Sequence, residues 1–256
     1  MLNLTLLSQI EAIAGQAGDL ILQVYGSDFA VRGKVDASPV TEADERAEAL
    51  IVAALQALTP GIPIVAEEAA AQGHAPTPGH CFWLVDPLDG TREFVSRNGE
   101  FTVNIALIEA GQPVLGVVLE PVASRVYAGV VGQGAWMQDP SGRRAIACRP
   151  VPLAAEAGWV LASSRSHGDE AALTAWLAGR TVAQRLAVGS SLKFGLIASG
   201  QADVYPRLGR TMEWDTAAGH AVLRAAGGTV TDLQGQPLRY GKPGFENPHF
   251  VAWGQR

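Results

Sequence analysis

Two segments near the start of the chain carry apolar residues at helical spacing. In residues 4–25 the apolar positions recur every three or four residues, which predicts a helix with one buried stripe. Residues 41–58 show the same period. Thr41 followed by Asp44 fits a capping box, in which the acid stabilises the start of the helix. Capping alone would account for Asp44, and a catalytic role is an equally open alternative.

Short apolar runs bounded by turn residues predict strands along the rest of the chain. In the first half, four successive runs predict an antiparallel meander. The second half alternates strands and helices, which favours an α/β layer. The predicted strands are 62–66, 82–85, 101–108, 114–120, 125–131, 134–137, 159–162, 181–188, 202–205, 228–232 and 249–253, and the later helices are 168–178, 189–197 and 213–226. We therefore predict a single α/β domain, 1–256, with sub-halves 1–150 and 151–256 joined by the segment 139–152, which is rich in Arg, Pro and Gly.

Composition narrows the classes of function. Hydrophobic residues make up 48% of the chain and charged residues 17%, which is typical of a globular protein. The formal charge of −6, without clusters of Lys and Arg, argues against a nucleic-acid duplex as partner. Cys81 and Cys148 form no ligand motif and are predicted to be free thiols.

Neither a signal peptide nor an apolar run long enough to span a membrane is apparent in the sequence. We therefore expect a cytoplasmic protein. Peripheral association with the inner membrane and a homodimer remain open.

The strand predicted to end near residue 85 runs into a dense polar motif, Asp86-Pro-Leu-Asp89-Gly-Thr. Pro87 biases Asp86 toward extended backbone, so its carboxylate is expected to project from the strand end. Gly90 permits close approach of the backbone to a ligand, and Thr91 adds a hydroxyl. A polar turn is the alternative, because Pro, Asp and Gly are common turn residues.

Other acids follow predicted elements in the same way. Glu67 follows the strand 62–66, and its carboxylate converges with Asp86 if the two strands are parallel neighbours. Asp215 lies at a helix start, where the helix dipole alone would favour it. A cluster of Glu67, Asp86, Asp89 and Asp215 would require cations, and Mg²⁺ prefers such oxygen ligands together with substrate phosphate. Two such ions roughly 3.5 to 4 Å apart can activate water and stabilise a leaving oxygen.

Two further segments suit an anionic ligand. A predicted helix opens with Gly189, Ser190 and Ser191, where exposed amides and hydroxyls can hold an anion. An ordinary N-cap serine is the alternative. Arg207 lies in the basic loop 206–210.

The motifs together resemble the lithium-sensitive, magnesium-dependent inositol monophosphatase superfamily. The resemblance is carried by Glu67-Glu68, by Asp86 to Thr91, and by Trp214 to Gly219, in that order along almost the whole chain. Within the superfamily the chain is most similar to the 3′(2′),5′-bisphosphate nucleotidases of the CysQ type, through residues 38–41, 92–94, 205–207 and 213–215. The resemblance implies an αβαβα sandwich and hydrolysis of 3′-phosphoadenosine 5′-phosphate to AMP and phosphate, which removes a by-product of sulfate assimilation.

The resemblance also implies roles for particular residues. Two or three Mg²⁺ ions would be held by Glu67, Asp86, the Leu88 carbonyl, Asp89 and Asp215. Thr91 and Asp44, with Glu67, would orient and deprotonate the attacking water. The implied substrate-binding residues are Asp89, Gly90, Thr91, Arg92, Ser190, Ser191, Lys193, Arg207 and Asp215.

Two positions bear on the substrate. Inositol monophosphatases carry an acid near the position of Arg207, where a base instead suits a second anionic group of a nucleotide. Arg92 replaces the lysine common in CysQ proteins, which keeps the charge but changes its geometry. The alternatives are an inositol monophosphatase or sugar phosphatase with the same chemistry, and a non-catalytic anion-binding protein of the same fold.

Overall fold

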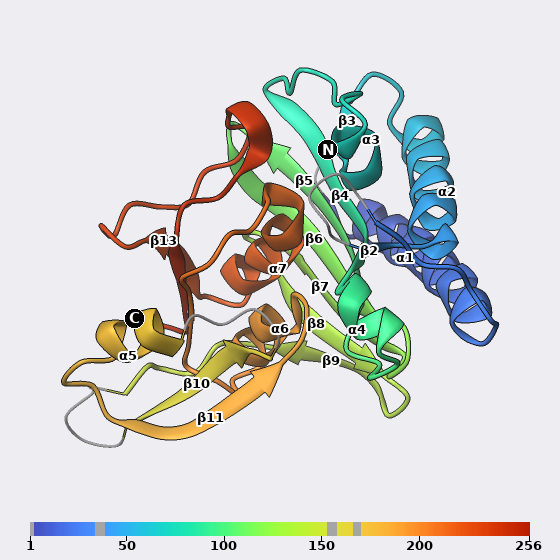
Figure 1. Cartoon of the computed structure of the whole chain (residues 1–256). Helices are drawn as coiled ribbons and strands as arrows, with labels where there is room; N and C mark the ends of the chain where they lie inside the picture. Colours follow the sequence, from blue (N-terminus) through green and yellow to red (C-terminus); the bar gives the residue numbers. More distant parts are fainter. Residues whose placement is uncertain (1–2, 34–38, 153–157, 166–169) are drawn as a thin grey trace.

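Two large β-sheets, seven α-helices and one short 3-10 helix, Pro243–Phe245, are found in the part of the chain that the computed structural model describes, residues 3–33, 39–152, 158–165 and 170–256 (Figure 1). The larger sheet has seven strands in the order β3-β4-β5-β6-β7-β8-β9, and all its neighbours except the parallel pair β3 and β4 are antiparallel. Its strands are β3 Ile64–Ala66, β4 Cys81–Asp89, β5 Thr102–Glu109, β6 Gln112–Glu120, β7 Arg125–Val130, β8 Gly134–Asp139 and β9 Gly142–Ile146. The predicted meander is therefore confirmed.

The smaller sheet is formed by the second half of the chain. It has five strands in the order β11-β10-β12-β14-β13, in which β10 is parallel to both its neighbours and β14 is antiparallel to both of its own. The strands are β10 Trp159–Ser164, β11 Val182–Val188, β12 Val204–Arg207, β13 Thr229–Asp232 and β14 Phe250–Trp253. A two-residue pair, β1 Arg32–Gly33 and β2 Pro39–Val40, lies apart from both sheets.

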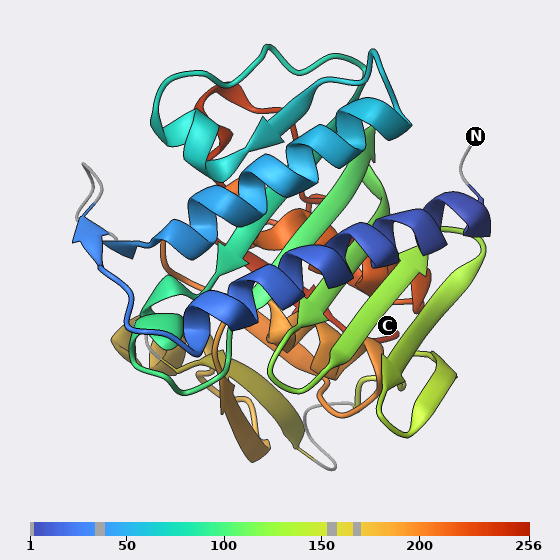
Figure 2. The same cartoon turned by 90° about the vertical axis from the view of Figure 1, so that its right-hand side faces the viewer.

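Helices α1 Leu4–Tyr25 and α2 Glu42–Leu58 cover one face of the larger sheet (Figure 2). The apolar stripe of α1, which includes Leu7, Ile10 and Ile21, is buried in one core cluster with sheet residues such as Val117. Helical periodicity in the sequence therefore corresponds to burial against the sheet, as predicted.

Helix α7 Glu213–Ala225 covers the opposite face of the larger sheet, and α6 Leu192–Ala198 packs beside it. The contact with the sheet is close because two strand positions lack side chains. A Cβ at Gly116 would lie 2.3 Å from the Ala218 carbonyl oxygen, and one at Gly129 would lie 2.8 Å from the Ala225 Cβ. Glycine at these positions lets the helix backbone rest on the strands.

The smaller sheet packs on the other side of α6 and α7, and α5 Glu170–Trp176 lies against its outer face through the core cluster of Leu173 and Trp253. The layers are thus helix, sheet, helix, sheet and helix, which confirms the predicted αβαβα sandwich. Asp215 lies in the central helix layer, in the first turn of α7.

The segment 139–152 was predicted to join the two halves, and this prediction is wrong for its first part. Residues up to Asp139 and from Gly142 onward form the β8 and β9 hairpin. Asp139 closes the turn by accepting the Ser141 backbone N–H at 2.9 Å and pairing with Arg144 at 2.8 Å. Pro140 and Gly142 therefore belong to a hairpin turn rather than to a linker.

The predicted end of the second strand near residue 85 is also wrong, because β4 continues to Asp89. Its register against β5 shifts between Asp86 and Asp89. Pro87 lies in this irregularity, where its missing N–H removes no regular ladder bond. The shift changes the direction of the strand just where the acidic motif begins.

Candidate active site

The first pair of acids lies at one edge of the larger sheet. Strands β3 and β4 pair in parallel, with Ala66 opposite Val85, so Glu67 and Asp86 follow neighbouring positions. The short helix α3 Glu67–Ala71 begins at once, and its first turn is held by Glu48, which accepts the N–H of Glu68 at 2.7 Å and that of Ala69 at 2.9 Å. The predicted parallel arrangement is confirmed.

The segment after Asp86 folds into a tight corner. Gly90 has φ +91° and begins the short helix α4 Thr91–Val95. A Cβ at Gly90 would lie 3.1 Å from the Glu100 carbonyl oxygen, so both the backbone angle and the space favour glycine. The Thr91 hydroxyl donates toward the Leu88 carbonyl at 3.3 Å and the Asp44 carboxylate at 3.2 Å. The corner therefore brings the Leu88 carbonyl, Thr91 and Asp44 together.

Asp44 uses its two oxygens for different tasks. Oδ2 accepts the backbone N–H of Thr41 at 2.8 Å and the Thr41 hydroxyl at 2.7 Å, so the predicted capping box is present. Oδ1 accepts the Thr91 hydroxyl. Capping of α2 thus fixes the orientation of a carboxylate whose other oxygen faces the site, and the two interpretations of Asp44 are compatible.

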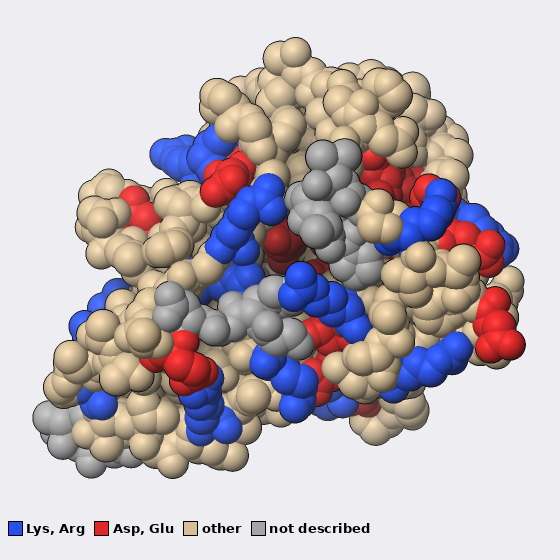
Figure 3. All heavy atoms as spheres, viewed as in Figure 1, with Lys and Arg blue, Asp and Glu red and all other residues tan. Residues whose placement is uncertain are grey.

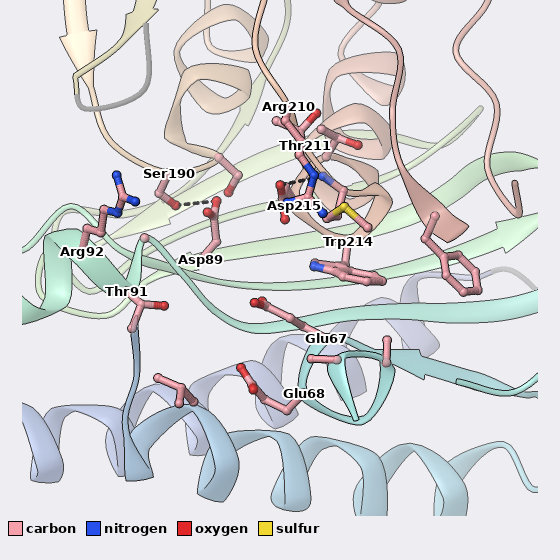
Figure 4. Close-up of a pocket in the computed structure, with 18 of the residues that line it drawn as sticks. Glu67, Glu68, Asp89, Thr91, Arg92, Ser190, Arg210, Thr211, Trp214 and Asp215 are labelled. Atoms are coloured by element: carbon pink, nitrogen blue, oxygen red, sulfur yellow. Dashed lines mark hydrogen bonds between the residues drawn. The ribbon is translucent and has the colours of Figure 1, made fainter. Parts of the chain in front are cut away.

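Asp215 comes from the other half of the chain. Its Oδ2 accepts the Met212 backbone N–H at 2.8 Å, which fixes the carboxylate at the start of α7. Glu67, Asp89 and Asp215 direct their carboxylates into the same space between the two halves (Figure 4). The structure therefore brings the predicted acids into one site.

Burial and mutual repulsion shape the protonation of these acids. Burial, followed by the charges of Glu67, Asp89 and Asp215, raises the pKa of Asp86 well above its usual range. Burial, followed by the charges of Asp89 and Glu67, also raises the pKa of Asp215 well above its usual range. Burial raises the pKa of Asp89 too, against the opposing effect of Lys193. Without a cation, the folded protein thus disfavours full ionisation of this cluster.

The donor set suits a hard divalent cation. Its members are carboxylate oxygens and one nearby backbone carbonyl, the ligand types that Mg²⁺ prefers. In the described part of the chain, however, no three His, Cys, Asp or Glu side chains already surround a point where an ion would sit. Three of the four acids instead have one oxygen held by a protein donor: the Leu88 N–H lies 3.0 Å from Asp86, the Ser190 hydroxyl 2.9 Å from Asp89, and the Met212 N–H 2.8 Å from Asp215. The residues therefore fit a metal in the chemistry of their donors, although their carboxylates do not surround an ion site in this conformation.

A group of hydroxyls borders Asp89. The Ser190 hydroxyl contacts Asp89 and Thr102, and the Ser191 hydroxyl donates to the Asn104 side-chain oxygen at 2.7 Å. Ser191 is the N-cap residue of α6, as the alternative expected, but its side chain makes no cap hydrogen bond to the helix. The two serines instead bind across to β5 of the larger sheet.

Lys193 lies beneath this group. Its ammonium donates to the carbonyls of Val188 and Ser190, and burial lowers the pKa of Lys193 to about 8. Only 3% of the residue is exposed, although it lines the pocket. The Lys193 ammonium thus donates hydrogen bonds to the backbone carbonyls on either side of Gly189.

Thr102 and Asn104 were missed as site residues. The Asn104 amide lies 3.5 Å from Asp89, and its oxygen accepts from Thr102 and Ser191. The signal was present in the sequence: two polar residues at alternate positions interrupt the apolar run 101–108, and alternate residues share one face of a strand. Glu48 was missed as well, because one acid on an amphipathic helix resembles a solvated residue.

One pocket of about 950 Å³ between the two halves of the chain is lined by Glu67, Asp89, Asp215, Ser190 and Ser191. Gly90, Thr91, Arg92 and Arg207 line it too. Figure 3 shows acidic side chains in a hollow between groups of Lys and Arg side chains. The pocket therefore combines a carboxylate centre with positive charge around it, which suits an anionic ligand.

Comparison with known proteins identifies the class to which this fold and site belong. The model of the inositol monophosphatase family matches residues 3–253, so the chain belongs to that family and is a phosphatase. The family's phosphatases are metal-dependent.

Individual relatives are similar over nearly their whole length. The chain is 47% identical over 250 residues to the 3′(2′),5′-bisphosphate nucleotidase CysQ of Escherichia coli O157:H7, which covers 96% of this chain and 98% of that one. It is 40% identical over 252 residues to the CysQ nucleotidase of Buchnera aphidicola subsp. Acyrthosiphon pisum, covering 96% and 93%.

Among solved structures, CysQ from Bacteroides thetaiotaomicron superposes with a TM-score of 0.80 at 36% identity, over 99% of this chain and 100% of that one. An inositol monophosphatase from Anabaena shares the fold, with a TM-score of 0.78 at 24% identity over 98% and 91% of the two chains. In the part of the chain described here, no helix combines the length and apolar character needed to cross a membrane.

Proposed function

We propose that this phosphatase hydrolyses 3′(2′),5′-bisphosphate nucleotides, with 3′-phosphoadenosine 5′-phosphate converted to AMP and phosphate. The observation that carries the proposal is the pocket itself, in which a carboxylate centre adjoins the Thr91 and Asp44 pair on one side and the hydroxyls near Lys193 and Arg207 on another. A substrate with two phosphate groups matches both parts. The names of the similar relatives support the same choice.

The metal is proposed to be Mg²⁺, two or three ions, held by Glu67, Asp86, the Leu88 carbonyl, Asp89 and Asp215. When bound, such ions lower the pKa of water and stabilise the charge of the leaving oxygen. The raised pKa values of Asp86 and Asp215 support this assignment, because cations would relieve the repulsion that causes part of the shift.

Thr91 and Asp44 are proposed to position and deprotonate the attacking water. The Thr91 hydroxyl donates to Asp44 Oδ1, so its oxygen is free to accept a hydrogen bond from the water. A proton can then pass from the water through Thr91 toward Asp44, with Glu67 facing the same space. Attack on phosphorus forms the new P–O bond and breaks the bond to the 3′ oxygen. That oxygen takes up a proton from solvent water and leaves as the 3′ hydroxyl of AMP, and inorganic phosphate is the second product.

Binding of the substrate is proposed to divide between two groups of residues. The amides of Gly90 and Thr91, with Asp89 and Asp215 through metal, would face the phosphate that is removed. Arg92, Ser190, Ser191, Lys193 and Arg207 would face the remainder of the nucleotide, including its second phosphate. Positive charge and hydroxyl donors are the groups that recognise a phosphate.

An inositol or sugar phosphate is the second candidate, favoured by the structural similarity to inositol monophosphatases. A panel of 3′-phosphoadenosine 5′-phosphate, inositol 1-phosphate and fructose 1,6-bisphosphate, assayed with and without Mg²⁺, distinguishes the candidates. We expect the highest kcat/KM for the nucleotide and phosphate release only with the metal. A preference for either other ester would reject the proposed substrate, and no release from any of them would reject the proposed function.

A further inference from the structure

We propose that Glu100 and Arg165 form a positioning pair that holds the Gly189 and Ser190 turn in its working geometry, and through Ser190 orients the Asp89 carboxylate. This inference rests on the proposed function for the chemistry that Asp89 serves. Neither residue lines the pocket. Each residue acts on the site through its contacts with the backbone at Ala187 or Gly189.

The pair joins the two halves of the molecule beside the site. Glu100 lies just before β5 of the larger sheet, and Arg165 directly follows β10 of the smaller one. The Arg165 guanidinium donates to both oxygens of Glu100, at 2.8 and 2.6 Å. A bidentate pair of this kind fixes orientation as well as distance.

Both members also bind the end of β11, which leads into the turn. Arg165 donates to the Ala187 carbonyl at 2.8 Å, and Glu100 Oε2 accepts the Gly189 backbone N–H at 2.7 Å. The carbonyl of Glu100 packs against the same glycine, since a Cβ at Gly189 would lie 2.8 Å from it. Residue 189 is therefore held by a side chain and a backbone group of one residue from the opposite half.

The turn needs such support because Ser190 has an unfavourable backbone conformation. Its φ of +53° lies in the left-handed region, which residues other than glycine rarely adopt without surrounding constraints. This conformation directs the Ser190 hydroxyl to Asp89 Oδ2 at 2.9 Å. If the turn relaxed, the donor that fixes this carboxylate would move away.

The same Glu100 carbonyl lies against the other corner of the site. A Cβ at Gly90 would lie 3.1 Å from it, so the backbone at Glu100 sits between Gly90 and Gly189. Those two glycines precede Thr91 and Ser190. One residue that touches no substrate thus sets the spacing between the two corners of the site.

The test replaces each member while keeping its shape: Glu100→Gln and Arg165→Met. We expect kcat lower by about 10- to 100-fold, as for a small misplacement of a reacting group, and a higher Mg²⁺ concentration at half-maximal activity. The KM for the nucleotide should change less than kcat. The double variant should lose no more than the worse single variant, because the two residues act as a unit. Arg165→Lys should retain an intermediate kcat, since lysine keeps the charge without the bidentate geometry.

Glu11 and Arg143 supply a matched control. This pair also joins distant segments, with N···O distances of 2.9 Å, and its side-chain exposures of 15% and 36% are comparable with the 22% and 48% of Glu100 and Arg165. Neither control residue lines the pocket. Glu11→Gln and Arg143→Met should therefore lower stability by a similar amount and leave kcat and the Mg²⁺ dependence unchanged.

Two measurements test the positioning role of Glu100 and Arg165 without using a substrate. Hydrogen exchange at residues 187–191 should become faster in Glu100→Gln, and calorimetry should show weaker Mg²⁺ binding. If the wild-type protein hydrolyses no ester in the panel, the proposed function fails, and these two measurements still decide the role of the pair. Unchanged exchange and metal binding, or equal losses of kcat in the control variants, would overturn the inference.

Discussion

At the scale of single residues, the site depends on carboxylates that are unfavourable in isolation. Asp215 illustrates this because its burial and its acidic neighbours both raise its pKa. A raised pKa in the folded protein means that the contribution of the group to stability is present below the unfolded pKa and is lost as the pH rises through the folded pKa. At neutral pH the unfolded chain releases this proton more readily than the folded protein does, so Asp215 lowers the stability of the metal-free protein.

Asp215→Asn tests this trade between stability and function. Asparagine removes the charge but can still accept the Met212 N–H. We expect a higher Tm for the metal-free variant than for the metal-free wild type at pH 8, with a difference that shrinks at pH 4. We also expect kcat lower by at least about 10³-fold, since metal ions supply several kcal/mol of transition-state stabilisation. A lower Tm at pH 8, or turnover near that of the wild type, would contradict the assignment.

Thr91 allows a second test at the same scale, because its hydroxyl joins Asp44 to the site. Thr91→Val keeps the shape and removes the hydroxyl, whereas Thr91→Ser keeps the hydroxyl. We expect kcat to fall by about 10² to 10⁴-fold in the valine variant, the usual contribution of a positioned proton acceptor, and by much less in the serine variant. Similar kcat values for the two variants would show that the hydroxyl takes no part in the reaction.

At the scale of elements, the helices and the strand meander were predictable because periodicity records which face is buried. The stripe of α1 and the runs that became β5, β6 and β7 are examples. The errors have physical causes. The second strand was predicted to end near residue 85, although β4 continues to Asp89 and a register shift accommodates Pro87 within it. The five-residue helices α3 and α4 are shorter than the window over which a helical period can be recognised in a sequence.

The contact between α7 and the larger sheet gives a prediction for an element. Gly116→Ala would place a methyl group 2.3 Å from the Ala218 carbonyl, so helix and strand must separate. We expect a loss of at least about 3 kcal/mol in the free energy of unfolding, measured by urea denaturation. A reduced kcat should accompany it because α7 carries Asp215.

Gly15→Ala is the matched control for this change. Gly15 lies within α1, and nothing would lie within 4 Å of a new Cβ. Alanine should therefore stabilise the helix by about 1 kcal/mol and leave kcat unaltered. Equal effects of the two substitutions would show that the close approach at Gly116 has little energetic importance.

At the scale of the whole molecule, the site exists only where the two halves meet. The convergence of Glu67 and Asp86 was predictable, since it needs only two parallel neighbouring strands. The contacts of Ser190 with Asp89 and Thr102 were not, because they depend on how one sheet packs against the other. Sequence patterns locate polar residues on an element, but they do not record which distant element lies opposite.

Acid unfolding of the whole molecule should report on His220, which is buried on α7. Its Nδ1 lies 2.9 Å from the Tyr240 hydroxyl, and burial lowers the pKa of His220 from 6.5 to about 3. The unfolded chain therefore binds a proton that the folded protein does not, and stability falls as the pH drops from about 6.5 toward about 3. At pH 5 this loss should be about 2 kcal/mol relative to pH 7.5. Urea denaturation of His220→Gln at both pH values should show a correspondingly smaller difference.

The exposed His80 provides the control for this titration. His80→Gln should leave the difference between the two pH values as it is in the wild type. An unchanged difference in His220→Gln would mean that other groups account for the acid sensitivity.

The position of α7 also affects how the protein folds during synthesis. One face of the larger sheet is covered by α1 and α2, which the ribosome makes first, but the other face, which includes Val118 and Tyr127, is covered by α7. At usual translation rates, on the order of ten seconds pass between the synthesis of this sheet and the synthesis of α7, and the apolar face stays uncovered during that time. The nascent chain thus presents a chaperone-binding surface during that interval, and translation that stops before residue 213 yields an aggregation-prone product.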